Sequence, residues 1–273
     1  MERLADFRNV FAQLVVARGG CAQNAALLHA FASVPRHMFL GLGPWTVSEH
    51  GTLTLGDDPA TVYQDIGFGL DAGIPTGLPS LHAALLDTAA PKPGERVIHV
   101  GAGTGYYTAI LAELVGATGH VHGFEINEAL AARARTNLAA WPRAFVEARS
   151  GVLVPDRPVD LIYVNAGVQQ LPRAWIDALA PDGRLVVPLM PTRGHGAVFV
   201  IGREAHGYSA RMLCPARFVP CIGTQDTALG ERFEEAFRGT ALASVRSLRL
   251  SEPPAPSACL SGAGWWLSSD SPE

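Results

Sequence analysis

Charged residues are scarce in this chain of 273 residues: Asp, Glu, Lys and Arg make up 17%, whereas hydrophobic residues make up 48%. A disordered chain has the opposite balance, so the composition excludes extensive disorder and predicts a sizeable core. The formal net charge is −4, and lysine and arginine form no block along the sequence. The sequence therefore predicts no nucleic-acid-binding surface, and we expect no nucleic-acid partner.

Cysteine is also scarce, with Cys21, Cys214, Cys221 and Cys259 scattered and without C-x-x-C spacing. This pattern argues against a disulfide framework and a zinc site, and it favours reduced thiols. No apolar run reaches the length of a membrane span, and the first ten residues lack the apolar segment of a signal peptide. We therefore expect a cytoplasmic protein with no membrane partner and no bound metal.

The stretch from residue 94 to residue 127 organises the rest of the chain. Its predicted order is strand 97–100, glycine turn 101–105, helix 107–115, strand 120–124 and then Glu125. Strand, glycine turn, helix and strand form the first unit of a dinucleotide-type α/β sheet. Glycines allow a sharp turn and a close approach of a ligand to the backbone, and an acid after the second strand suits two ribose hydroxyls.

The glycine spacing separates two kinds of cofactor. A nicotinamide site has G-x-G-x-x-G, but here the run is G-x-G-x-G and Tyr106 stands at the third glycine position. The tighter pattern, with an acid about 20 residues further on, resembles class I S-adenosylmethionine-dependent methyltransferases. We favour that cofactor over a nicotinamide, and the expected cofactor-binding residues of this stretch are Gly101, Ala102, Gly103, Thr104, Gly105, Glu125 and Ile126.

Other segments predict a helical cap before the sheet and further strands after it. Expected are two helices within 1–40, a loop-rich region at 41–80 and helices at 79–88, 128–141, 171–179 and 231–237. Strands are expected at 145–148, 159–164 and 185–189, and a hairpin at 196–202 and 209–213. The serine- and proline-rich tail 251–273 contains Trp265 and Trp266, which we expect to dock because wet indoles are unfavourable.

Five segments, in order over about residues 7–223, resemble protein-L-isoaspartate O-methyltransferases: VPRHMF at 34–39, YQD at 63–65, GAGTGYYTAILAELVG at 101–116, PDGRLVVPL at 181–189 and RFVP at 217–220. The resemblance implies a doubly wound, mostly parallel Rossmann-like sheet, S-adenosyl-L-methionine as methyl donor and a carboxylate acceptor on a peptide, protein or metabolite. It also implies a methyltransferase domain at 1–223, with cap and substrate loop at 1–90 and core at 91–223. A C-terminal extension at 224–273 would pack on that core.

The sequence departs from that family at several functional positions. The family's S-Q-P triplet corresponds to Gly77-Leu78-Pro79, so its serine is replaced by glycine and the nearest hydroxyl is Thr76. The family's G-D-G corresponds to Arg149-Ser150-Gly151, and its small residues after the fourth strand to Asn165-Ala166-Gly167. The residues expected from these alignments are Thr76 and Asp65 as catalytic, Gly77, Leu78, Pro79 and His82 as substrate-binding, and Ser150, Gly151 and Asn165 as cofactor-binding.

The chemistry leaves the acceptor open. A carboxylate is ionised at pH 7 and needs no general base, so positioning and exclusion of water would supply most of the rate. An alcohol or amine acceptor would need a base, for which His37, His50 and His82 are candidates. A third hypothesis is a non-catalytic protein that uses the methyltransferase scaffold to bind a cofactor or a partner.

Overall fold

The structure is a computed structural model and describes residues 2–47, 53–70, 74–154 and 157–272. Two compact units divide the chain. Unit 1 contains Met1–Glu95 and Ala102–Arg149, and unit 2 contains Arg96–Gly101 and Ser150–Glu273. The first glycine of the predicted cofactor loop thus ends a segment of unit 2, and the remaining loop residues begin a segment of unit 1.

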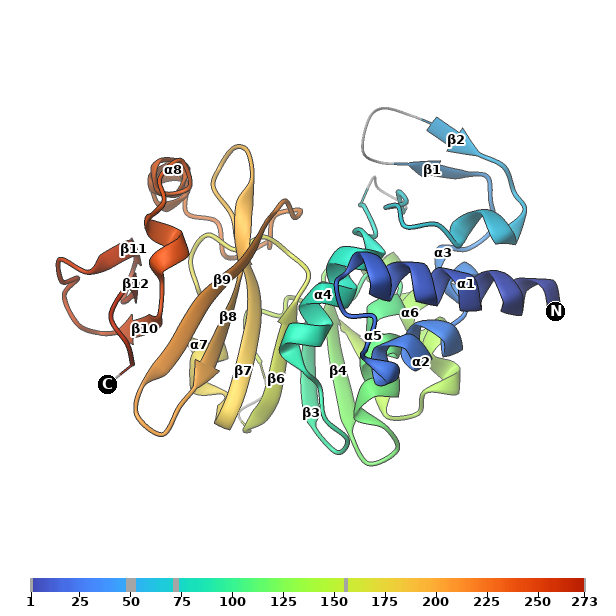
Figure 1. The fold of residues 1–273 in the computed structure, drawn as a ribbon, viewed down its shortest axis with the longest axis horizontal. Coiled ribbons are helices and arrows are strands. Elements are labelled where there is room, and N and C mark those ends of the chain that lie inside the picture. The colour runs from blue at the N-terminus through green and yellow to red at the C-terminus, as the bar shows by residue number, and fades with distance from the viewer. Residues whose placement is uncertain (1, 48–52, 71–73, 155–156, 273) are drawn as a thin grey trace. The chain divides into compact units, whose positions relative to one another are not determined.

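Unit 1 is largely helical. Its helices are α1 (Glu2–Arg18), α2 (Ala25–Ser33), α3 (Arg36–Leu40), α4 (Pro79–Ala89), α5 (Tyr106–Val115) and α6 (Glu128–Asn137), with a 3₁₀ turn η3 at Leu138–Ala140. Asn24 begins α2 as expected, because its side-chain oxygen accepts a hydrogen bond from Leu27 N at 3.0 Å. α1 and α2 lie side by side (Figure 1) and bury Phe11 and Phe31.

The segment before α4 is more regular than expected. It was predicted as an irregular loop, but it forms strands β1 (Trp45–Val47) and β2 (Leu53–Leu55) and the 3₁₀ turn η1 (Pro59–Val62). The β-branched and apolar residues of β1 and β2 favour extended backbone, and Asp58 caps η1 by accepting from Ala60 N at 3.0 Å. Gly and Pro around these short elements concealed them in the sequence.

Two parallel strands complete unit 1: β4 (His120–Glu125) and β5 (Ala144–Ala148). Their partners run in register from Val121 opposite Ala144 to Glu125 opposite Ala148. Glu125 therefore stands at the carboxyl end of its strand, where parallel α/β sheets place their ligands.

Unit 2 contains the strands β3 (Arg96–Val100), β6 (Val159–Val164) and β7 (Leu179–Leu189), which pair in parallel in the order β3-β6-β7. The short helix α7 (Arg173–Asp177) connects β6 to β7. The predicted helix at 171–179 ends earlier, because β7 already starts at Leu179. Strand β7 therefore begins before the predicted strand 185–189, and its pairing with β6 is irregular ahead of Arg184, with Asp182 at φ 60°.

Antiparallel strands extend this sheet. The hairpin of β8 (Gly196–Arg203) and β9 (Tyr208–Ala216) confirms the prediction, and β8 pairs with β7. Beyond it lie α8 (Thr227–Ala236), the 3₁₀ turn η4 (Ala241–Ser244) and the strands β10 (Ser247–Leu250), β11 (Ala258–Gly262) and β12 (Trp265–Ser268). In unit 2 the strand order is β11-β12-β10-β9-β8-β7-β6-β3 (Figure 1).

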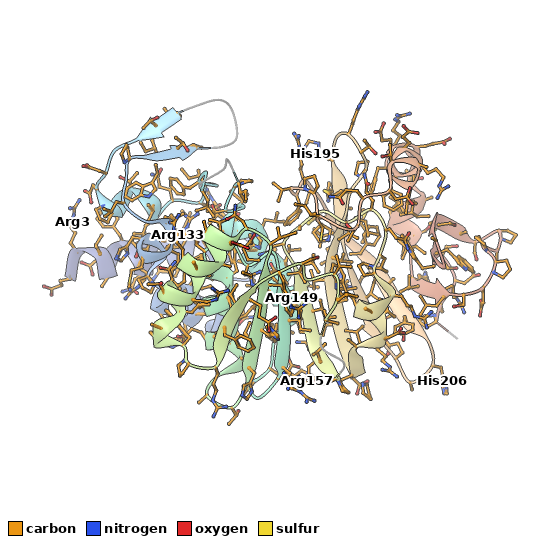
Figure 2. The ribbon with its side chains drawn as sticks, turned by 180° about the vertical axis from the view of Figure 1, so that it is seen from behind. Arg3, Arg133, Arg149, Arg157, His195 and His206 are labelled. Carbon is orange, nitrogen blue, oxygen red and sulfur yellow. The ribbon has the colours of Figure 1, made fainter. Side chains whose placement is uncertain are left out.

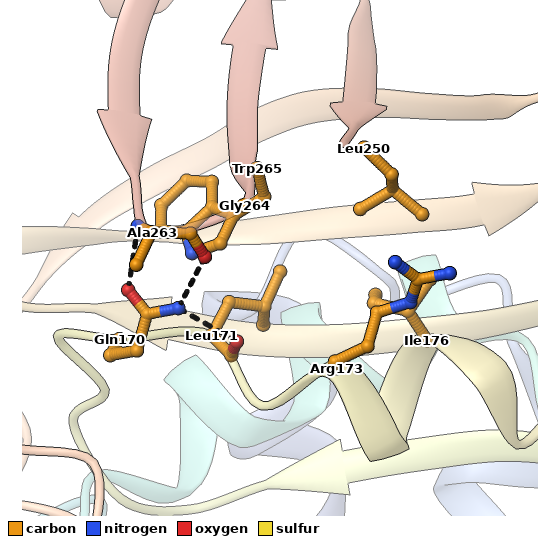
Figure 3. Close-up of a pocket in the computed structure, with 8 residues that line it drawn as sticks. All are labelled: Gln170, Leu171, Arg173, Ile176, Leu250, Ala263, Gly264 and Trp265. Carbon is orange, nitrogen blue, oxygen red and sulfur yellow. Dashed lines mark hydrogen bonds between the residues drawn. The ribbon is translucent and has the colours of Figure 1, made fainter. Parts of the chain in front are cut away.

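The segment 251–273, expected as a tail, contains the two strands β11 and β12. Trp265 and Trp266 are each 4% exposed, which confirms that they dock. The side-chain amide of Gln170 holds the turn before β12, accepting from Ala263 N at 3.0 Å and donating to Ala263 O at 2.9 Å (Figure 3). A cavity of about 60 Å³ lies beside this contact. No helix in the described ranges is long and apolar enough to cross a membrane.

Candidate functional site

The glycine loop follows β3 in the chain and leads into α5 as a tight turn, which is hydrogen-bonded to the end of β4. Ala102 N donates to Phe124 O at 3.1 Å, and Gly105 N donates to Ala102 O at 2.9 Å. Gly103 and Gly105 have φ of 55° and 93°, a left-handed region that favours glycine. Gly105 caps α5, whose first turn has no side-chain cap, so backbone N–H groups of that turn face the ligand side of the loop.

Glu125 is joined to this loop by its carboxylate. Its Oε2 accepts from Gly103 N at 2.8 Å, and its Oε1 accepts from Asn127 N at 2.9 Å. The residue is only 7% exposed. Each carboxylate oxygen retains a second lone pair, so the group can accept two further hydrogen bonds. The structure thus places the acid beside the loop glycine Gly103.

Two neighbours of this site play different parts. Ile126 follows the acid and is 45% exposed, so it offers apolar surface beside the carboxylate. Thr104 is 4% exposed, and its carbonyl accepts from Asn137 Nδ2 at 2.9 Å. Thr104 therefore supports the loop through its backbone, whereas Ile126 is accessible to a ligand.

In unit 2, Asn165 lies beside Gly101. Its backbone N donates to Val100 O at 2.8 Å, and a Cβ on Gly101 would stand 3.2 Å from its carbonyl oxygen. The side-chain Nδ2 donates to His99 Nε2 at 2.9 Å, and Oδ1 is buried without a hydrogen-bond partner in the described chain. Burial lowers the pKa of His99 to about 3, which keeps the imidazole neutral and able to accept.

Ser150 and Gly151 occupy the other predicted cofactor positions of unit 2. Ser150 Oγ accepts from Val152 N at 3.3 Å, and Gly151 O accepts from Trp175 Nε1 at 2.8 Å. Trp175 is fully buried, so Gly151 anchors the core through its carbonyl.

Arg149, which is labelled in Figure 2, precedes these residues. It is the last residue of unit 1. Its Nε donates to Glu147 Oε2 at 2.6 Å, and its guanidinium lies 4.2 Å from the centre of the Phe124 ring. The hydrogen bond from Arg149 lowers the pKa of the Glu147 carboxyl. These contacts join Arg149 to β4 and β5.

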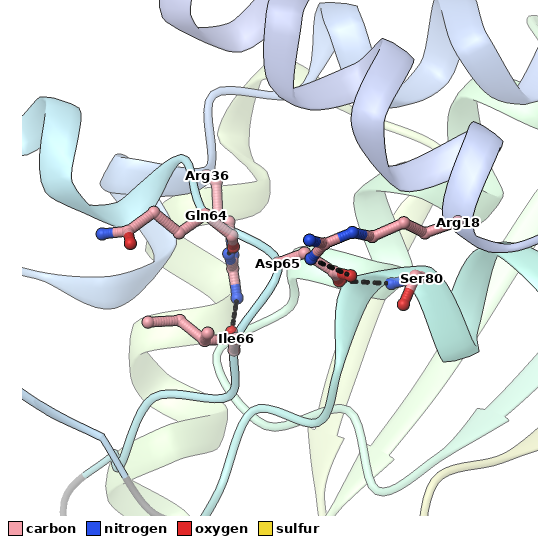
Figure 4. A network of polar contacts seen from close by, with 6 residues as sticks. All are labelled: Arg18, Arg36, Gln64, Asp65, Ile66 and Ser80. Atoms are coloured by element: carbon pink, nitrogen blue, oxygen red, sulfur yellow. Dashed lines mark hydrogen bonds and ion pairs between the residues drawn. The ribbon is translucent and has the colours of Figure 1, made fainter.

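Asp65, predicted as catalytic, anchors a helix. Its Oδ1 accepts from Ser80 N, in the first turn of α4, at 2.8 Å, and its Oδ2 pairs with Arg18 Nη1 at 3.3 Å (Figure 4). The side chain is 3% exposed. A carboxylate at a helix N-terminus is stabilising, because it satisfies a free N–H and complements the helix dipole.

Thr76, the second catalytic candidate, joins the two sides of the substrate loop. Thr76 N donates to Phe68 O at 2.8 Å, and Phe68 N donates to Thr76 Oγ1 at 2.9 Å. The hydroxyl also lies 3.4 Å from Gly77 O. These contacts hold the loop just before the predicted substrate residues.

Gly77 and His82 occupy the same space. Gly77 has φ 75°, and a Cβ at that position would collide with His82 Nε2 and stand 3.1 Å from Cδ2. His82 is 2% exposed and stacks on Tyr107, with ring centroids 3.8 Å apart. The imidazole thus fills the place of the missing serine side chain. Leu78 and Pro79 begin α4, with Pro79 in its first turn.

Of the other histidines, His37 contacts Tyr63, with 2.7 Å between Nδ1 and the phenol oxygen. Burial, with Arg8 nearby, lowers its pKa. A neutral imidazole paired with a phenol is a structural contact at this position. His50, the third base candidate, lies outside the described residues.

Arg36 has a role that the sequence reasoning missed. It is 1% exposed and donates to three backbone carbonyls of the segment that carries Asp65. The available signal was a lone charge in the apolar run VPRHMF. A buried arginine in such a run needs acceptors, but the sequence does not say which.

Comparison with known proteins identifies the same family as the motifs. A family described as protein-L-isoaspartate(D-aspartate) O-methyltransferase matches residues 14–226. A protein-L-isoaspartate O-methyltransferase from Methylorubrum populi is 34% identical over 212 residues, covering 76% of this chain and 91% of that protein. Another from Roseiflexus sp. is 31% identical over 223 residues, covering 80% and 93%.

Solved structures agree on the fold. A structure named protein-L-isoaspartate O-methyltransferase has a TM-score of 0.67 at 22% identity and covers 89% of this chain and 73% of its own. A Plasmodium falciparum β-aspartate methyltransferase in complex with S-adenosyl-L-homocysteine has a TM-score of 0.64 at 20% identity, covering 78% and 97%. At these sequence identities the two structures are evidence for the fold alone. They confirm the predicted Rossmann-like α/β class.

Proposed function

The chain belongs to the protein-L-isoaspartate(D-aspartate) O-methyltransferase family, and we propose that it methylates an isoaspartyl carboxylate of peptides or proteins. It is an S-adenosylmethionine-dependent methyltransferase. We also propose the reducing cytoplasm as its location, because the four cysteines are free. The non-catalytic hypothesis is not favoured, since the match spans the cap, the loop and the core.

The observation that carries the cofactor assignment is the placement of Glu125. Its carboxylate bonds the loop glycine Gly103, and spare lone pairs remain for two ribose hydroxyls. Ile126 would lie against the apolar face of the adenine, and the N–H groups of the first turn of α5 suit the carboxylate of the methionine part. The residues present therefore fit S-adenosylmethionine.

For Asn165 we propose a separate contact. Its buried Oδ1 has no partner in the described chain, and the bond from Nδ2 to His99 fixes the orientation of the amide. The amide oxygen is therefore a candidate acceptor for a donor group of the cofactor. We also propose Ser150, which directly follows unit 1 in the chain, as a contact for the adenine edge.

The bound cofactor supplies a methyl group activated by the sulfonium, and the protein contributes positioning. A carboxylate acceptor is ionised at neutral pH and attacks without a base. The residues proposed near the acceptor fit this scheme. Thr76 Oγ1 accepts a hydrogen bond from Phe68 N within the loop, and Asp65 Oδ1 accepts one from Ser80 N of α4. We therefore assign both as positioning residues, and we propose Gly77 and Leu78, which are partly exposed, as the surface that contacts the acceptor. The buried residues Pro79 and His82 would support that surface from behind.

The test is methyl transfer from labelled S-adenosylmethionine to paired peptides that differ only in isoaspartate or aspartate. We expect the isoaspartyl peptide to be preferred. No transfer to either peptide, with cofactor binding intact, would contradict the proposed acceptor and leave other carboxylates, including those of metabolites, to be screened.

A second experiment tests the cofactor site. Replacing Glu125→Ala removes hydrogen bonds to a charged acceptor, each worth about 1.5–3 kcal/mol, so we expect S-adenosylhomocysteine affinity to fall about 100-fold or more by calorimetry. The matched control is Glu128→Gln, an exposed acid three residues away in the first turn of α6. Equal affinity of Glu125→Ala and the control would remove the ribose role.

A further inference from the structure

Arg36 is a fully buried cation, and within the described ranges its hydrogen bonds go to one segment of backbone. Nη1 donates to Val62 O at 2.8 Å and to Gln64 O at 2.6 Å, and Nη2 donates to Ile66 O at 2.8 Å (Figure 4). Val62 ends the 3₁₀ turn η1, and Gln64 and Ile66 lie in the irregular backbone that follows it. A planar guanidinium can donate to several such acceptors at once, whereas a lysine ammonium is a single point charge.

Aromatic rings enclose the same guanidinium. Its central carbon lies 5.2 Å from the centre of the Phe11 ring, 5.1 Å from that of Phe68 and 5.9 Å from that of Tyr106. No carboxylate of the described residues pairs with Arg36 directly, so carbonyl dipoles and ring faces balance the charge. Burying a charge this way is expensive for stability alone, because an apolar residue would pack there more cheaply.

The segment that Arg36 holds carries Asp65, which connects it to the acceptor side. Between the bonded carbonyls of Gln64 and Ile66, the Asp65 side chain leaves toward α4 and accepts from Ser80 N at 2.8 Å (Figure 4). Arg18, at the end of α1, pairs with the other oxygen of this carboxylate at 3.3 Å. The first turn of α4 is thereby fixed to a backbone segment that Arg36 fixes in turn.

The far side of the loop returns to the same segment. Phe68, two residues after Ile66, exchanges hydrogen bonds with Thr76, immediately before Gly77. The residues from Gly77 to Pro79 are therefore held at both ends, by Thr76 before them and by Ser80 after them. Both attachments lead back to residues 62–68.

We infer that Arg36 is a positioning residue for the acceptor site, acting through the backbone of residues 62–66 and the Asp65 carboxylate on the loop 76–80. This inference rests on the proposed function for the identity of the acceptor. It assigns no direct contact between Arg36 and the substrate. It separates the two binding steps: disturbing Arg36 changes acceptor binding and leaves cofactor binding intact.

The decisive variant is Arg36→Lys, which keeps the positive charge but loses the planar guanidinium that donates to several carbonyls at once. Hydrogen exchange is measured first, since it needs no substrate: we expect faster exchange at 62–68 and 76–82 and unchanged exchange at 120–127. In the methylation assay we expect the acceptor KM to rise about 10- to 100-fold, with the affinity for S-adenosylhomocysteine within about twofold of wild type. Arg3→Lys is the control, because Arg3 is an exposed arginine of unit 1 paired with Asp58.

Several outcomes would overturn the inference. Unchanged exchange at 62–82 in a folded Arg36→Lys protein is one, and an equal loss of cofactor and acceptor binding is another. If Arg36→Lys does not fold, Asp65→Asn tests the same connection downstream, and an unchanged acceptor KM in that variant refutes it. Failure of the proposed function is distinct, since the wild-type enzyme itself would then leave both peptides unmethylated.

Discussion

Replacing Gly77 by serine would restore the residue type that the family carries, yet we expect it to damage this protein. Gly77 has φ 75°, and its missing Cβ is replaced in space by His82 Nε2. His82 cannot retreat easily, because it is 2% exposed and stacked on Tyr107. The glycine and the histidine are therefore coupled, and a single substitution addresses only half of the pair.

The magnitude follows from two contributions. A left-handed φ costs an L-residue about 1–2 kcal/mol, and overpacking a filled site costs about 1–3 kcal/mol. Loss of the unfolded-state freedom of glycine offsets about 0.4–1 kcal/mol of that. We expect Gly77→Ser to lower the free energy of unfolding by about 1–4.5 kcal/mol, or the melting temperature by about 2–18 °C.

Thermal and denaturant unfolding of four proteins tests this reasoning: wild type, Gly77→Ser, His82→Val and the double variant. The control is Gly20→Ser, since Gly20 has φ 71° and open space around its missing Cβ, so only the backbone contribution applies. We expect a favourable coupling of about 1–3 kcal/mol in the double variant. A Gly77→Ser protein as stable as Gly20→Ser, or a double variant no better than the sum of its parts, would refute the assigned collision.

Two further predictions concern unit 2. His99 has a folded pKa of about 3 against about 6.5 unfolded, so its neutral form stabilises the fold above pH 6.5, and that contribution falls by about 1.4 kcal/mol per pH unit as the pH drops toward 3. Unfolding at pH 7 and pH 5 should show wild type losing about 2 kcal/mol more than His99→Gln, and equal losses would contradict a buried neutral histidine. Gln170→Ala removes both hydrogen bonds to Ala263, worth about 2 kcal/mol together. In Gln170→Ala, amide hydrogen exchange at 258–268 should be faster than in the control variant Gln13→Ala, which changes an exposed glutamine. Unchanged exchange would contradict the role of the Gln170 amide in holding this turn.

Much of the fold could be predicted because it depends on local pattern. The apolar β-branched runs at 97–100 and 159–164 form strands whichever residues surround them, and Gly103 and Gly105 form the turn that their backbone freedom permits. The strands of the C-terminal segment were missed, since short strands among serine and proline take their stability from neighbours. Trp265, opposite Gly262 and Leu250, is paired only in the folded sheet.

The family, the cofactor loop and the acid Glu125 could be identified from the sequence alone. The glycines and the acid stand at a fixed spacing on successive elements, and these elements bring them together when they fold. Only the tertiary structure shows the contacts of the residues predicted for the acceptor side. Asp65, predicted as catalytic, accepts from Ser80 N and pairs with Arg18, which supports the positioning role that we propose for it. His82 fills the space beside Gly77, and Arg36 donates hydrogen bonds to the backbone of residues 62–66. These contacts join segments whose spacing in the sequence carries no periodic signal. Such contacts depend on packing in three dimensions, which the order of residues along the chain does not express.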